Sequence, residues 1–195
     1  MDLVHRLGLQ QRWIYEALIS TFYHGIPHAA PIGVWVHGTD DLRMDVYDGS
    51  RTLADILEVG QYAANFPADV CALYAALRAP EQLSFEPARC VCAPVVGGCT
   101  ATVELTLSSA TRRGEKMRLV GEVKCVYGAG PPRLINRAEG LLLESLVVAT
   151  RPERLEPGVA LAALTENRRV VSKVAPGSAY ERALEALLRD LERSS

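Results

Sequence analysis

Apolar and polar positions in the first part of the chain follow the period of β-strands. Residues 12–21, RWIYEALIST, form an almost continuous apolar run rich in β-branched and aromatic side chains, which is typical of a strand covered on both faces. Residues 31–36, PIGVWV, predict a second strand, and residues 42–47, LRMDVY, alternate strictly. We therefore expect the chain to begin as an antiparallel meander.

Helical spacing first appears at residues 50–59 and returns at residues 69–78, with a short predicted strand at 61–66 between them. Two long alternating segments follow, at residues 100–110 and 116–128, and the TRRGEK stretch between them predicts a hairpin loop. The order of elements favours an antiparallel barrel with inserted helices.

The last third of the chain has apolar stripes of helical period. They predict helices at 136–151, 158–174 and 178–191, the last beginning with a capping box of Ser178 and Glu181. The predicted class is α+β, a small antiparallel barrel with a helical subdomain.

Composition fits an ordinary globular protein of 195 residues, with 49% hydrophobic and 23% charged residues and a net charge of -2. Arginines are scattered, so we expect no nucleic-acid partner. No apolar run reaches the length of a membrane helix, and the first residues lack the pattern of a signal peptide. The odd, unevenly spaced set of five cysteines favours free thiols and a cytoplasmic location.

A zinc site is the first chemistry to test, because Cys90, Cys92 and Cys99 lie within ten residues. Their spacing lacks a second ligand pair, so we interpret them as small hydrophobic side chains and expect no metal. The four histidines have no companion ligands at metal spacing and are interpreted as loop residues: His5, His24, His28 and His37. Nucleophile-elbow, dinucleotide-binding and P-loop patterns are absent.

The segment YDGSRTLADI, at the start of the first predicted helix, has two interpretations. Thr52 and Asp55 form a capping-box pattern and Ser50 can cap as well, so local structure explains them. A helix N-terminus also offers free N–H groups to a phosphate, and Arg51 adds a charged fork. Both interpretations stay open at the level of local sequence.

The order of these motifs resembles that of the FMN-binding split-barrel proteins, which are flavin-reductase-like. HAAPIGVW, GSRTLADI and a strand ending AANF occur in sequence, and a later helix carries NRA-G-E and ATR. Among split barrels, the chain is most similar to a family of uncharacterised flavin-binding proteins with a helical C-terminal extension. The resemblance covers residues 13–190.

The resemblance implies a split-barrel domain at 1–132 and a helical subdomain at 133–195 packed on it. It implies FMN as cofactor, with the phosphate at the GSRT segment, the ring along the API-G backbone, and the later asparagine and NR residues near the flavin. The implied contacts are Ala30, Pro31, Ile32, Gly33, Ser50, Arg51, Thr52, Asn65, Asn136 and Arg137. The last two would reach across the interface of a homodimer.

One residue departs from the family pattern, since Asp55 stands where the split-barrel helix often carries Asn. A carboxylate there repels a phosphate unless it turns away, and pairing with Arg51 would favour a neutral ligand. The expected function is reduction of a small, pterin-like molecule with a nicotinamide donor, and Tyr47 and His28 are the candidate proton donors. A flavin carrier or sensor and a dimeric interaction domain with a vestigial pocket are the alternatives.

Overall fold

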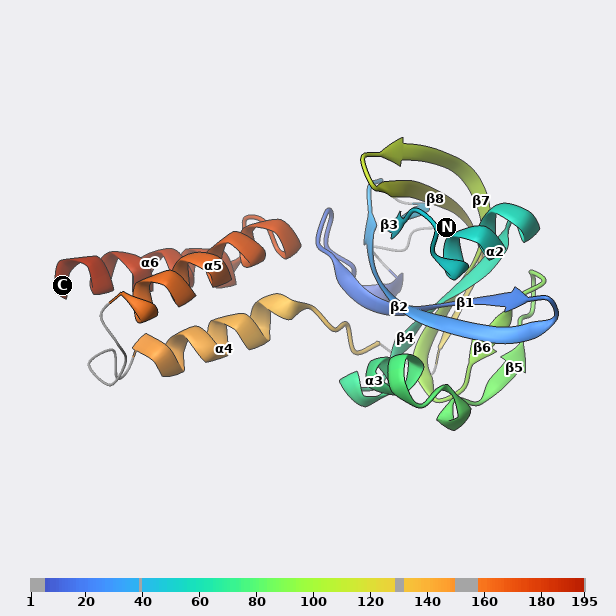
Figure 1. Cartoon of the computed structure of the whole chain (residues 1–195), viewed down its shortest axis with the longest axis horizontal. Coiled ribbons are helices and arrows are strands. Elements are labelled where there is room, and N and C mark those ends of the chain that lie inside the picture. Colours follow the sequence, from blue (N-terminus) through green and yellow to red (C-terminus); the bar gives the residue numbers. More distant parts are fainter. Residues whose placement is uncertain (1–5, 39, 129–131, 150–157, 195) are drawn as a thin grey trace. The chain divides into compact units, whose positions relative to one another are not determined.

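Six antiparallel strands form a closed barrel in the computed structural model, which describes residues 6–38, 40–128, 132–149 and 158–194 (Figure 1). The strands are ordered β1-β2-β3-β8-β7-β4, and β4 returns to pair with β1. Their bounds are Tyr15–Tyr23 (β1), Ile26–Val36 (β2), Asp41–Tyr47 (β3), Gln61–Pro67 (β4), Cys99–Arg113 (β7) and Lys116–Gly128 (β8). The predicted α+β class and barrel are confirmed.

Strand β2 begins five residues before the predicted PIGVWV strand and includes Pro27 and Pro31. Proline cannot donate to a strand neighbour, so it is tolerated where one edge of a strand is free. Residues 26–33 pair with β1 alone, and pairing with β3 covers only residues 34–36. The prolines thus lie where β2 lacks a second neighbour.

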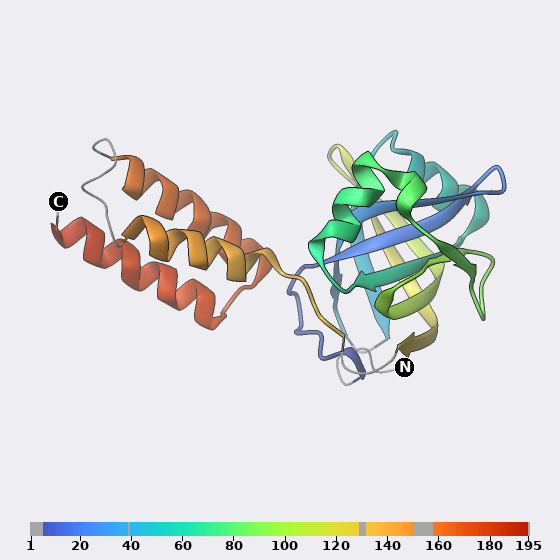
Figure 2. The ribbon, with the colours of Figure 1, turned by 90° about the horizontal axis from the view of Figure 1, so that it is seen from below.

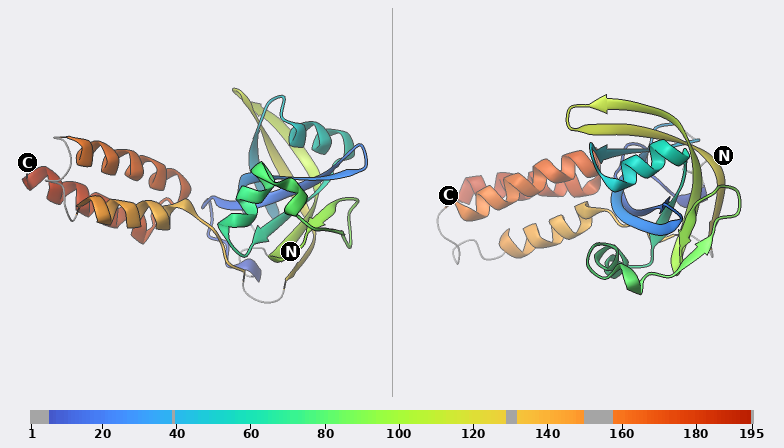
Figure 3. Two further views of the ribbon diagram at one scale, coloured as in Figure 1. Left: turned by 60° about the horizontal axis from the view of Figure 1, so that its bottom comes forward. Right: turned by 45° about the vertical axis from the view of Figure 1, so that its right-hand side comes forward.

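Two helices accompany the barrel, α2 (Arg51–Val59) and α3 (Val70–Arg78), and they lie on different sides of it (Figure 3). Helix α2 begins at Ser50, whose hydroxyl accepts from Leu53 N at 3.3 Å, and ends at Gly60 in the left-handed conformation. The predicted cap of α3 is also confirmed, because Asp69 accepts from Cys71 N at 2.7 Å.

A short two-stranded sheet escaped the sequence-based prediction. It pairs β5 (Phe85–Pro87) with β6 (Pro94–Val96), after a 3₁₀ turn at Pro80–Gln82. Strands of three residues are too short to show a hydrophobic period. The β7–β8 hairpin, conversely, turns at Gly114 and Glu115, so β7 extends three residues further into the predicted loop while β8 begins where it was predicted.

The barrel interior is closed by bulky side chains, among them the fully buried Tyr62, Phe66 and Leu105. Gly121 of β8 faces this layer, and a Cβ at this position would collide with the Tyr62 hydroxyl and with Leu105. Glycine is required here because the aromatic ring occupies the space that a side chain would fill.

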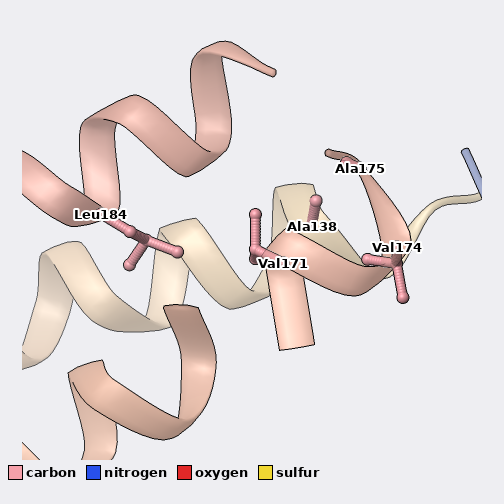
Figure 4. Close-up of a cluster of buried hydrophobic side chains, with 5 residues drawn as sticks. All are labelled: Ala138, Val171, Val174, Ala175 and Leu184. Carbon is pink, nitrogen blue, oxygen red and sulfur yellow. The ribbon is translucent and has the colours of Figure 1, made fainter. Parts of the chain in front are cut away.

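The three C-terminal helices form a separate compact unit, in which they run side by side (Figure 2). They are α4 (Arg137–Ala149), α5 (Val159–Val174) and α6 (Ala179–Ser194). Their shared core is shown in Figure 4 and contains Ala138, Val171, Val174, Ala175 and Leu184. The three predicted helices are confirmed as elements, while the end of the first one, at residues 150 and 151, lies outside the described residues.

By contacts, one unit comprises Met1–Gln11 and Tyr15–Ile135, and the other comprises Arg12–Ile14 and Asn136–Ser195. The short segment before β1 therefore belongs with the helices: Ile14 N donates to Val174 O at 2.9 Å. The packing of the helical subdomain on the barrel stays a prediction. None of the described helices is both long and apolar enough to cross a membrane.

Candidate functional site

The candidate site lies where strands β2 and β3 part. The two strands pair only from Val34↔Met44 to Val36↔Leu42. Residues 26–33 of β2 pair with β1 alone, and residues 45–47 of β3 pair with β8 alone. Alternate residues of an antiparallel strand direct their N–H and C=O groups away from the paired neighbour. The four predicted ring contacts, Ala30, Pro31, Ile32 and Gly33, thus lie on a strand with one free edge.

Helix α2 starts beside this split (Figure 1). Ser50 caps the helix through Leu53 N, which removes one of the unpaired donors of the first turn. The backbone N–H groups of Arg51 and Thr52 have no hydrogen-bond partner within the described ranges. Both lie at the positive end of the helix dipole, so the first turn has donors left for an anion.

Two side chains of this turn contact the β1–β2 hairpin. The guanidinium of Arg51 lies 4.0 Å from the ring centroid of Tyr23, and Thr52 Oγ1 lies 3.5 Å from Nε2 of His28. Arg51 is exposed and Thr52 is buried. Through these contacts, the residues predicted to bind the phosphate lie next to the hairpin whose second strand, β2, carries the residues predicted to contact the flavin ring.

Asp55 turns away from the first turn of α2 and into the protein. Its side chain is 3% exposed and Oδ2 accepts a hydrogen bond from Thr21 Oγ1 of β1 at 2.8 Å. No ion pair between Asp55 and Arg51 is present in the described part of the chain. The carboxylate therefore leaves the guanidinium of Arg51 available to a ligand.

His28 is half-buried at the site, and its pKa lies below the usual value of 6.5. Burial is the largest cause, since it disfavours the charged imidazolium, and the positive charge of Arg51 acts in the same direction. The carboxylate of Asp55 opposes both. The imidazole is therefore neutral at pH 7.

The side chain of Asn65 bonds within the barrel, and its contact with a flavin stays a prediction. Its side chain is fully buried, its amide donates to Leu18 O and Ser20 Oγ, and its oxygen accepts from Val96 N and Thr102 Oγ1. These four bonds use the whole hydrogen-bonding capacity of an asparagine side chain. We therefore interpret Asn65 as a structural residue that joins β1, β4, β6 and β7.

Asn136 and Arg137 belong to the helical unit. The Asn136 amide donates to Ile14 O and Val174 O, both at 2.9 Å, and its oxygen accepts from Ala138 N at 2.7 Å. Asn136 thus starts α4 and fixes it to the chain before β1. Arg137 is exposed, and its proposed contact with a flavin stays a prediction.

Two of the remaining candidates flank this turn, since Tyr47 O accepts from Ser50 N and His24 follows Tyr23. Tyr47 is exposed at the end of β3 with Lys116 Nζ 4.2 Å from its ring centroid, and the ring of His24 lies tilted against that of Tyr23, with 4.4 Å between the centroids. His5 lies outside the described residues. The interpretation of the cysteines as small buried hydrophobic side chains is wrong for Cys90 and Cys92, which are exposed, and Cys90 lies beside Cys125 and Glu104.

An apolar cavity of about 340 Å³ adjoins the β1–β2 hairpin, with Phe22 and Pro27 on one side and the β5–β6 segment on the other. Its lining is mostly aliphatic and aromatic, which is typical of a small-molecule pocket. Pro27 and His28 are consecutive residues of β2, whose side chains point to opposite faces of the strand, so the cavity lies across the β1–β2 hairpin from α2. Short strands without a sequence signal form its second wall, which is why the sequence did not predict it.

The barrel, the split and the three C-terminal helices define the class of protein, since they match solved structures of FMN-binding split-barrel proteins. The chain belongs to the DUF447 family of proteins of unknown function, because the model of that family's N-terminal domain matches residues 15–127.

Three solved structures illustrate the likeness. An FMN-bound protein of the same family from Methanosarcina mazei is 21% identical with a TM-score of 0.57, over 97% of this chain and 99% of that one. Flavoredoxin from Methanosarcina acetivorans is 20% identical with a TM-score of 0.53, over 61% of this chain and 74% of that one. The flavin reductase component of a bacterial two-component tryptophan halogenase is 16% identical with a TM-score of 0.52, over 61% and 82%.

Proposed function

We propose that this protein is a flavoprotein that binds FMN at the split between β2 and β3, with the phosphate at the start of α2. The observation that carries the proposal is that the N–H groups of Arg51 and Thr52, which have no partner among the described residues, lie beside the exposed guanidinium of Arg51. Helix N-termini bind phosphate, and the planar arginine fork matches its oxygens. The M. mazei family member, which is described as FMN-bound, supports the same ligand.

The free edge of β2 suits the flat, polar edge of a flavin ring. At this edge Gly33 directs an N–H and a C=O group outward and Pro31 supplies only a C=O, whereas Ala30 and Ile32 direct their groups toward β1. Backbone dipoles along the ring are a usual means by which a protein adjusts flavin electronics. The residues present therefore fit FMN at both of its polar ends.

Bound FMN would supply hydride chemistry, so the protein needs no acid or base of its own for that step. We propose that a nicotinamide is the donor and that a small molecule, pterin-like in size and shape, is the acceptor. His28, whose neutral imidazole lies near Thr52, would orient the substrate or exchange a proton with it at the edge of this site.

The proposal includes a homodimer. Large apolar side chains remain exposed around the split, including Ile26 (62%) and Tyr47 (60%), and such surface is typical of a covered face. In the dimer, Asn136 and Arg137 of one subunit would lie near the flavin of the other. Light scattering on the purified protein tests the assembly.

A direct experiment is to purify the protein, record its visible spectrum and release the bound ligand by heat. The proposal predicts a yellow protein that releases FMN in a ratio near one per chain, and a loaded protein that oxidises a nicotinamide rapidly. Loaded protein without nicotinamide oxidation would instead favour a carrier or sensor. A colourless protein that also fails to bind added FMN would overturn both and leave a vestigial pocket.

A further inference from the structure

A cluster of two thiols and one carboxylate lies on the barrel at the β7–β8 pair, outside the proposed flavin site. The ligand atoms of Cys90, Glu104 and Cys125 all lie within 4.8 Å of one another. Cys125 is directly opposite Glu104 in the strand register, and Cys90 comes from the loop that joins β5 and β6. Residues far apart in the sequence are thus gathered at one point.

The carboxylate of Glu104 is held in place before any ligand arrives. It is fully buried, and it accepts hydrogen bonds from Arg89 N at 2.7 Å, Cys90 N at 2.6 Å and Tyr127 Oη at 2.7 Å. Metal-ligating side chains are typically oriented by such outer hydrogen bonds. A solvated surface carboxylate would have none of this support.

The charges around the cluster also suit a divalent cation. Two thiolates and one carboxylate carry three negative charges, and a dication leaves one. The guanidinium of Arg89 stacks on the Tyr127 ring at 3.8 Å and supplies a further positive charge beside it. The whole arrangement is then neutral, which limits the cost of placing charge at a partly buried point.

We propose that Cys90, Cys125 and Glu104 bind a zinc ion, with water in the fourth position. Tetrahedral zinc takes thiolate sulfur at about 2.3 Å and carboxylate oxygen at about 2.0–2.2 Å, so its ligand atoms lie roughly 3–4 Å apart. A small closure of the cluster reaches this geometry. Cys90 is exposed, which leaves a side open to solvent for the water.

Binding would release the two thiol protons to solvent for each Zn²⁺ taken up, with no change of oxidation state. The ion would fasten the loop carrying Cys90 to strands β7 and β8. Ala88, Val91 and Cys92 of the same loop line the apolar cavity, so the ion would also order one wall of it.

The test is a titration of the reduced, chelator-treated protein with Co²⁺ as a spectroscopic probe, followed by displacement with Zn²⁺. One equivalent of Co²⁺ should give tetrahedral d–d bands to the red of any flavin absorption, and Zn²⁺ should abolish them and raise Tm. The variants Cys90→Ser and Cys125→Ser should lose the bands. The matched variant Cys71→Ser, an exposed cysteine on α3, should keep them.

Tyr127→Phe adds a graded test, because it removes one support of Glu104 while leaving every ligand. Affinity should fall by about 10- to 100-fold, the usual effect of losing an outer hydrogen bond. Absence of tetrahedral bands in the wild-type protein, or equal binding by the Cys90→Ser and Cys125→Ser variants, would overturn the proposal. So would a Cys90–Cys125 disulfide in protein that binds no metal after reduction.

Discussion

Thr52 Oγ1 lies 3.5 Å from Nε2 of His28, and this contact joins the first turn of α2 to strand β2. It places a titratable ring between the predicted phosphate position and the free strand edge. The imidazole is half-buried, with Arg51 and Asp55 as the charged groups that act on it. The pKa of His28 should therefore change when a charged ligand binds at the split.

The first prediction concerns the protonation of His28. Its pKa should be below 6.5 in the ligand-free protein, because burial and Arg51 disfavour the cation. Since the unfolded chain then binds the proton more readily than the folded one, His28 lowers the free energy of unfolding as pH falls below 6.5. FMN should raise the pKa of His28, because a phosphate favours the cation.

NMR titration of the imidazole signals measures this directly. Riboflavin, which lacks the phosphate, should move the His28 titration much less than FMN does. His37, which follows the last residue of β2, provides the internal control for bulk effects of pH. Identical titration curves with and without FMN would contradict a phosphate near His28.

Asp55 provides a second prediction, because it is the residue that departs from the family pattern. Asp55→Asn removes a negative charge near the helix N-terminus while an amide oxygen can still accept from Thr21. FMN affinity should rise, and riboflavin affinity should stay nearly constant. Fluorescence-quenching titrations with the two ligands give the comparison, and a fall in FMN affinity would show that the carboxylate supports the ligand.

A substitution of Asn65 distinguishes a structural role of this residue from a role in cofactor binding. Asn65→Ala removes a partner of Leu18 O, Val96 N and Thr102 Oγ1, at roughly 1–3 kcal/mol for each buried group left unpaired. Urea unfolding should show a large loss of stability. The folded fraction should bind FMN with unchanged affinity, and a selective loss of FMN binding in a stable protein would restore the cofactor role.

Two glycines, one in the barrel and one in helix α4, give a matched test of the packing inside each unit. Gly121→Ala should destabilise the barrel by about 1–3 kcal/mol, because the new methyl group collides with Tyr62. Gly140→Ala, on an exposed turn of α4 with open space around it, should stabilise its helix by up to about 1 kcal/mol. Changes in Tm of opposite sign are expected, and equal changes would contradict this packing.

Most elements of the fold could be predicted because their hydrophobic period is long and regular. The β8 strand matched its predicted range of 116–128, and the cap of α3 by Asp69 was visible as a residue type in the right place. The β5–β6 sheet was not predicted, since three residues cannot show a period. The early start of β2 was hidden by Pro27 and Pro31, whose tolerance depends on a strand edge that only the tertiary structure leaves free.

The candidate site was predicted in part for the same reason. Ser50, Arg51 and Thr52 are contiguous, so local sequence revealed the helix start that they form. The contacts of Arg51 with Tyr23 and of Asp55 with Thr21 join distant segments, and no spacing in one sequence indicates them. The proximity of Cys90 to Cys125 could not be predicted for the same reason. It depends on the position of the loop between β5 and β6, whose Cys90 N donates a hydrogen bond to Glu104.

The affinity ratio of FMN to riboflavin, measured for the wild-type protein and for Arg51→Ala, tests the central claim most directly. Arg51→Ala should weaken FMN binding by roughly 1.5–3 kcal/mol, the value of a hydrogen bond to a charged group, and riboflavin binding much less. Arg78→Ala, an exposed arginine at the end of α3, is the control and should change neither. Equal losses for both ligands, or no preference for FMN in the wild-type protein, would contradict a phosphate site at the start of α2.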